Sequence, residues 1–154
     1  MKNTFLFLWF LIFFGCSGFE PIFSTKDLRF YIGDIENVDN KKNTKKIIRN
    51  IRSYKLDDND NKKEYILKIN SKTNNLVTSR DSKGNPLTYS VSIDVEIKVF
   101  KESSNLILKT IFIKKDFIYN YQTNQFALGQ YKKDIIKNLV DKISEEIIVE
   151  LQLI

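Results

Sequence analysis

Polar and apolar residues alternate most regularly between Leu87 and Val99. Seven apolar side chains occupy every second position of this stretch, with polar or charged side chains between them. A period of two places one set on a buried face and the other on a solvated face of a strand, whereas a helix repeats every 3.6 residues. The pattern therefore predicts a long, half-buried strand over residues 87–99.

Three other segments, 28–35, 64–77 and 106 to about 119, are apolar enough to form strands. The polar stretch 78–86 contains Gly84, Asn85 and Pro86, so we expect a loop there. Residues 101–105 are few enough to predict antiparallel pairing of the last two strands. Apolar residues of 106–119 fall on both phases of that strand, which indicates a bulge or burial on both faces.

Two segments have helical periodicity. The first, 43–56, repeats isoleucine at helical spacing after the N-cap candidates Asn43 and Thr44 and turns lysine and arginine to its other side. Ordinary solvation is the expected role of that basic side, and a binding surface is the alternative. The second helix opens at Thr123 or Asn124 and runs toward Leu151. Its apolar stripe is expected to pack in the core and comprises Leu128, Tyr131, Ile135, Leu139, Ile143 and Ile147.

The element order is thus β-α-β-β-β-α, which predicts an α+β fold. Two helices packed on one face of a four-stranded, mixed or largely antiparallel sheet would bury every apolar stripe described above. Residues 28–154 are about the usual size for a single domain.

The N-terminus has the pattern of a lipoprotein signal peptide. Lys2 precedes an apolar run over 5–14, which is shorter than the about 20 residues that a spanning helix needs. Cys16, the single cysteine of the chain, follows Gly15 directly, as in a lipobox, although Phe13 departs from the usual aliphatic residue. A buried free thiol is the alternative. We therefore expect a signal peptide at 1–15, a lipidated tether at 16–27 and, on Cys16, diacylglycerol and an N-acyl chain.

Composition argues against an enzyme. The chain has no histidine, and lipid would consume its cysteine, so the commonest zinc ligands and the usual general base are missing. Its five glycines are isolated and form no phosphate loop. The acidic run Asp57–Asp60 lacks the glycine and terminal glutamate of a calcium loop and is expected to be a turn. We expect no metal and no cofactor, while the net charge of +6 favours an anionic partner.

Three stretches resemble the lipopolysaccharide-assembly lipoprotein family, LptE. The first is Cys16-Ser17-Gly18-Phe19-Glu20-Pro21-Ile22-Phe23, in which Ser17 is an insertion relative to the family pattern. The second is the alternating strand, its hairpin and the strand that ends in Phe117-Ile118-Tyr119-Asn120-Tyr121. The third is Asn124-Gln125-Phe126-Ala127 followed by Tyr131, where Lys132 and Lys133 replace an acidic residue of the family.

The resemblance implies an outer-membrane lipoprotein, held on the periplasmic side by its lipid, that has no enzymatic activity. It implies a plug inside the β-barrel translocon LptD and a role in lipopolysaccharide assembly, with no nucleic-acid partner. Ser17, where aspartate favours retention at the inner membrane, fits sorting to the outer membrane. The alternative function is a free periplasmic lipoprotein that binds an anionic ligand or glycan without a barrel.

Lipopolysaccharide carries phosphates, which lysine and arginine clusters bind. The candidates for such a site are Arg80 and Lys83 in the predicted loop and Lys114 and Lys115 on the following strand. Antiparallel pairing is expected to bring these four cations near one another. The alternative is that they are ordinary solubilising residues of a lysine-rich chain.

Overall fold

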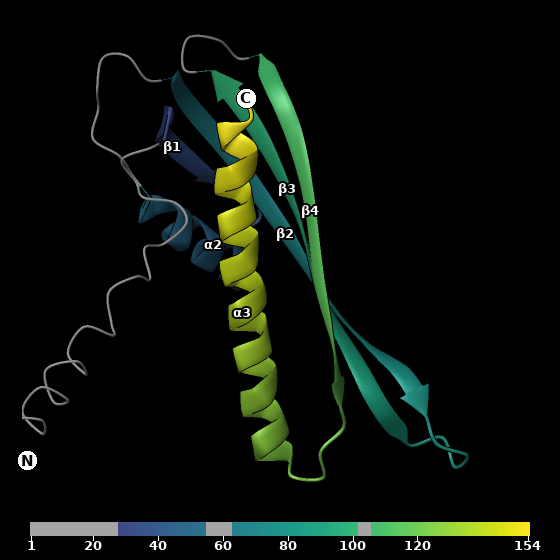
Figure 1. Ribbon diagram of the computed structural model, residues 1–154. Coiled ribbons are helices and arrows are strands. Elements are labelled where there is room, and N and C mark those ends of the chain that lie inside the picture. Colours follow the sequence, from purple (N-terminus) through teal and green to yellow (C-terminus); the bar gives the residue numbers. More distant parts are fainter. Residues whose placement is uncertain (1–27, 55–62, 102–105) are drawn as a thin grey trace, which may run out of the picture.

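The computed structural model describes residues 28–54, 63–101 and 106–154 (Figure 1). Its elements follow the order β-α-β-β-β-α, so the predicted α+β fold is confirmed. They are β1 Phe30–Asn37, α2 Lys42–Arg52, β2 Lys63–Arg80, β3 Pro86–Lys101, β4 Ile107–Asn120 and α3 Gln125–Gln152. Among these residues no helix is both long enough and apolar enough to cross a membrane.

The four strands form one mixed sheet in the order β1-β2-β3-β4. β1 is parallel to β2, because α2 returns the chain to the end of the sheet at which β1 begins. β2, β3 and β4 are successively antiparallel. Ile69, Ile97 and Ile111 are direct neighbours across three strands. Residues two apart share a face of a strand, so this register aligns the alternating apolar rows of all three strands on one face.

Both helices cover that apolar face, and α3 runs along the sheet beside α2 (Figure 1). Alternate β3 residues from Val91 to Val99 are buried against them, as the period of two predicts. Leu139 and Ile143 of the α3 stripe are also buried, but Tyr131 is not, since the sheet diverges from the first turns of the helix. No helix of the described residues lies over the opposite face, here called the bare face.

The predicted cap of the first helix is wrong. α2 begins at Lys42, and its N-cap residue Lys41 makes no side-chain capping bond. Asn43 and Thr44 lie inside the first turn and instead bond β2, Asn43 to the Thr73 hydroxyl and Thr44 to the Ser71 hydroxyl. The sheet therefore takes the polar side chains that the sequence alone assigns to a cap. The predicted end at Leu56 is wrong as well, because α2 ends at Arg52 with Ser53 as its C-cap.

The predicted loop 78–86 is shorter than expected. Strand pairing continues until Arg80 lies opposite Pro86, with irregular register beyond Val77. Asp81 closes the turn, because its carboxylate accepts hydrogen bonds from the backbone N–H groups of Lys83 and Asn85, both at 2.8 Å. Gly84 has a positive φ of 84°, which a glycine adopts without steric cost.

The ambiguous phase of the last strand has a local cause. The register shifts between Val99 and Phe100 and leaves Leu108 as an extra residue, so the predicted bulge is confirmed. Beyond it Ile111 and Ile113 face the core, whereas Phe112 is 75% exposed on the bare face.

Asn124 is the N-cap of α3, as predicted. Its side-chain oxygen accepts hydrogen bonds from the backbone N–H groups of Phe126 and Ala127, both at 3.1 Å. Two of the N–H groups that a helix start leaves without partners are thereby satisfied.

Candidate interaction surfaces

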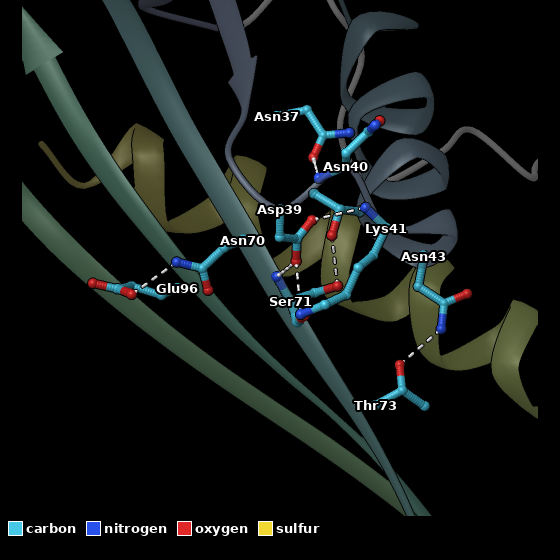
Figure 2. A network of polar contacts seen from close by, with 10 residues as sticks. Asn37, Asp39, Asn40, Lys41, Asn43, Asn70, Ser71, Thr73 and Glu96 are labelled. Carbon is cyan, nitrogen blue, oxygen red and sulfur yellow. Dashed lines mark hydrogen bonds and ion pairs between the residues drawn. The ribbon is translucent and has the colours of Figure 1, made fainter.

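A polar network joins the turn before α2 to β2 (Figure 2). The Asp39 carboxylate accepts the backbone N–H of Ser71 at 2.7 Å and that of Lys41 at 3.0 Å. The Lys41 ammonium donates to the Ser71 carbonyl oxygen at 2.7 Å and lies 3.2 Å from Asp39. These contacts hold β2 at a point beyond Asn37, the last residue of β1. The network therefore anchors α2 to the sheet.

The charge of Asp39 is stabilised within this network. Burial would by itself raise the pKa of its carboxyl, but hydrogen bonds from Ser71, Lys41 and Thr44 outweigh burial and lower the pKa from its ordinary value. Thr44 and Ser71 satisfy each other in the interior, with their hydroxyls 2.6 Å apart. Because these groups bond one another, the network serves the fold rather than a ligand.

The four cations predicted to converge do not lie together. Arg80 and Lys83 lie at the β2–β3 turn, where the Arg80 guanidinium donates to the Gly84 carbonyl oxygen at 2.7 Å. Lys114 and Lys115 pair with the middle of β3, and the β4 residue nearest the turn is Asn120, opposite Thr88. At about 3.3 Å per residue, some 25 Å of strand separates the two pairs.

Lys114 and Lys115 also point to opposite faces of the sheet. Lys114 lies beside Asp94 on the bare face, at 3.9 Å, and Lys115 forms an ion pair with Glu146 of α3 on the covered face. The expectation of one four-cation site is therefore wrong, because β4 continues six residues beyond Lys114 before it reaches the end of the hairpin. Cys16, the predicted lipidation site, lies outside the described residues.

Exposed apolar side chains lie at the end of the sheet that contains the β2–β3 hairpin. Leu76 and Ile118 flank Ser90 on the bare face and are 65% and 60% exposed. Leu87 and, at the start of α3, Phe126 are exposed too. We call these four residues the distal tip. In Figure 1 the end of the β2–β3 hairpin diverges from α3, and Leu76 and Ile118 lie on the sheet face that points away from both described helices.

Tyrosine rings brace the sheet just above the distal tip. Tyr89 and Tyr119 are stacked with their ring centroids 5.6 Å apart, and Tyr131 of α3 meets Tyr119 edge-on at 6.1 Å. The Tyr119 hydroxyl donates to the Asn75 side chain at 3.1 Å. Burial, with a smaller contribution from Tyr89, raises the pKa of Tyr119 above its ordinary value. The strands next to the distal tip are thus held in place by packed tyrosine side chains.

A groove of about 500 Å³ runs along α3 beside Phe117 of β4. Its floor includes Ile135 and Leu139, and its rim carries three carboxylates and one lysine. The rim residues are Asp134, Asp141, Glu145 and Lys142. This excess of negative charge disfavours a phosphate-bearing ligand. Sequence reasoning missed the groove, although the acidic residues recur on α3 at seven- and four-residue intervals.

The middle of the bare face carries polar side chains that pair with one another, beside the exposed Phe112. Asn70 donates to Glu96 and Asn74 donates to Asp94, both at 2.9 Å, and Lys98 lies 3.6 Å from Glu96. No cluster of three or more metal-ligating side chains occurs within the described ranges. The middle of this face therefore offers a charged surface to solvent.

The sequence matches no protein-family model and no curated protein. The fold, however, matches solved structures. Rare lipoprotein B from Shewanella oneidensis superposes with a TM-score of 0.59 at 16% identity, over 78% of this chain and 91% of that one. Lipoprotein B from Nitrosomonas europaea gives 0.64 at 16% identity, over 86% and 88%. A minor lipoprotein from Acinetobacter baumannii gives 0.57 at 10% identity, over 82% and 92%.

The chain has the fold of lipoprotein B. Rare lipoprotein B proteins are the LptE family. The fold that the resemblance in the sequence implies is therefore the fold observed. Since the neighbours match most of this chain and nearly all of their own length, the likeness includes both helices and the sheet.

Proposed function

We propose that this chain is an LptE-type lipoprotein, anchored in the outer membrane through lipid on Cys16, that plugs the β-barrel LptD and assists lipopolysaccharide assembly. The observation that carries this proposal is the lipoprotein B fold in a chain whose first residues have the lipobox pattern. In this role the protein recognises a partner and performs no chemistry of its own.

The two uncovered parts of the sheet support the proposal in different ways. The polar middle of the bare face suits the water-filled interior of a large barrel. The distal tip supplies apolar side chains for contact with a partner. The β2–β3 hairpin also has strand edges, where backbone N–H and C=O groups can pair with a partner strand. We assign the barrel contact to this end of the sheet and leave the core-bearing end outside it.

Co-purification tests the proposal directly. The protein, tagged at its C-terminus in the native membrane and extracted in mild detergent, is expected to bring down a much larger protein whose gel mobility changes on heating, as that of a barrel does. Recovery of the lipoprotein alone would contradict the plug and favour a free binder of anionic ligands or glycans. Replacing Cys16 with serine is expected to release the protein from membranes when the barrel is absent.

A pair of matched variants locates the contact. We expect Leu76→Ser with Ile118→Ser to reduce recovery of the barrel, because the distal tip loses its apolar contacts. The control is Leu106→Ser with Leu153→Ser, which removes two leucines that are equally exposed at the other end of the molecule. Equal recovery with both variants would place the contact elsewhere on the sheet.

A further inference from the structure

One face of α2 concentrates positive charge. At 100° per residue its five cations fall within an arc of about 120°. They are Lys42, Lys45, Lys46, Arg49 and Arg52, here called the basic face. Thr44, Ile47 and Ile51 on the opposite side are buried, so the core fixes which way the basic face points.

Among residues 28–54, 63–101 and 106–154, no acidic side chain pairs with the basic face. The helix contains no acidic residue, and none of the five cations forms an ion pair with another described residue. Three described acids near α2 have other partners. Asp39 pairs with Lys41, and Asp141 accepts a hydrogen bond from the Asn50 side chain. Asp34, which lines a pocket together with Arg52, accepts the backbone N–H of Ile35. Five like charges on three turns repel one another, so an anionic surface opposite them would stabilise the arrangement.

Several lysines outside α2 do have acidic partners. Lys109 pairs with Glu150 at 2.9 Å, and Lys115 pairs with Glu146. The lysines of α3 alternate along the helix with aspartate and glutamate. The basic face is therefore a local property of α2 and does not merely reflect the lysine content of the chain.

The length of chain before the domain limits where this face can go. The twelve residues from Cys16 to Asp27 precede Leu28, the first described residue. Even fully extended they span about 40 Å. If Cys16 carries lipid, as proposed above, the start of β1 stays within that distance of the bilayer, and α2 follows β1 after only four residues.

We propose that the basic face of α2 docks on the anionic phospholipid headgroups of the leaflet that holds the anchor. This inference rests on the proposed lipid anchor. Arginine and lysine donate charge-assisted hydrogen bonds to phosphate oxygens, and each basic residue at such a surface contributes about a five-fold gain in affinity. The apolar side of α2 is used by the core, so the helix lies on the headgroups without inserting, and salt weakens the contact.

Lysine reactivity in vesicles tests the docking. The full lipoprotein is reconstituted into phosphatidylcholine vesicles with and without phosphatidylglycerol, acylated briefly, and mapped by mass spectrometry. We expect labelling of Lys42, Lys45 and Lys46 to fall several-fold when phosphatidylglycerol is present and to recover in high salt. Lys133 and Lys137 of α3 are expected to react equally in both vesicles.

Two triple variants with the same charge change sharpen the test. Lys45→Gln, Arg49→Gln and Arg52→Gln together are expected to abolish the protection of Lys42 and Lys46. Lys133→Gln, Lys137→Gln and Lys142→Gln together are expected to leave it intact. All six positions are exposed, and circular dichroism checks that both variants fold. Equal loss of protection in both variants would reduce the effect to net charge and overturn the proposal.

The outcomes separate this inference from the anchor. A protein that floats with both kinds of vesicle but whose α2 lysines react equally in both keeps its anchor and contradicts the docking. A protein that floats with neither contradicts the anchor and the docking together. Protection that is as strong in phosphatidylcholine alone would show a contact that does not depend on anionic lipid, which also overturns the proposal.

Discussion

The two ends of the sheet are built differently. The covered half, where β2 runs from Lys63 to Thr73, lies beneath both helices and holds an isoleucine-rich core. The distal half, from Asn74 to the hairpin, keeps the ladder of β2 and β3 but exposes Leu76 and Leu87. The same strands thus supply stability at one end and contact surface at the other, because burial stabilises only where a helix closes the face.

The largest effect is expected from truncation of the covered core. Ile93→Ala or Leu139→Ala should lower the free energy of unfolding by about 2–5 kcal/mol, since each leaves a cavity in a packed interior. Leu76→Ala and Leu87→Ala in the distal half should each change it by less than about 0.5 kcal/mol. Urea denaturation followed by circular dichroism measures both. Similar losses of free energy of unfolding in the two halves would contradict the proposed difference between them.

An intermediate effect on the free energy of unfolding is expected when the carboxylates of two turns are replaced. Asp39, whose side chain is 12% exposed, anchors α2, whereas Asp81 closes the exposed hairpin turn. Asp39→Asn should cost about 1–3 kcal/mol, because it weakens charge-assisted bonds to backbone N–H groups. Asp81→Asn should change the stability much less. Denaturant titrations at neutral pH measure both variants.

The pKa values give this comparison a pH dependence. The pKa of the Asp39 carboxyl is lowered in the folded protein, with burial opposing and hydrogen bonds prevailing. Its contribution is therefore fully present above the unfolded value of 3.8 and is lost as pH falls through the folded value. Acid titration of stability should show a shallower decline for Asp39→Asn than for the unmodified protein. Parallel curves would exclude Asp39 as a source of acid sensitivity.

The smallest effect is expected at the start of α3. Asn124→Ala removes the cap that serves the N–H groups of Phe126 and Ala127 and should cost about 1 kcal/mol. The matched change at the start of α2, Asn43→Ala, removes a bond to Thr73 and no cap, so its helix should fray no further. Amide hydrogen exchange in the first turn of each helix distinguishes the two. Faster exchange is expected in α3 alone.

Periodicity along the chain was enough to predict the element order and the helix-covered face, and the short connection 101–105 predicted the antiparallel pairing of β3 with β4. The alternation in β3 and the Asn124 cap were predicted correctly, because the tertiary contacts agree with these local signals. The Asn43 and Thr44 cap failed because both side chains satisfy β2 instead. Competition between a cap and a strand partner is not visible until the two segments are brought together.

Strand register accounts for most of what sequence reasoning missed. Thr78 and Ser79 read as loop residues, yet their hydroxyls meet that of Thr88 across the hairpin at 2.6 and 2.7 Å and extend the ladder. Lys114 and Lys115 were misplaced for another reason of register, because they pair with the middle of β3 and not with its end near Arg80. Leu76 and Ile118 are exposed because their register places them opposite Ser90 on the bare face, and this register becomes visible only once the strands are paired.

The length of β2 has a consequence for the proposed complex. Its 18 residues span about 60 Å at about 3.3 Å each, roughly twice the about 30 Å of a bilayer's hydrocarbon layer. A molecule of this length that enters a membrane barrel by its hairpin must leave about half of itself in the periplasm. The part left outside is the end that carries α2, which would hold that helix at the level of the headgroups.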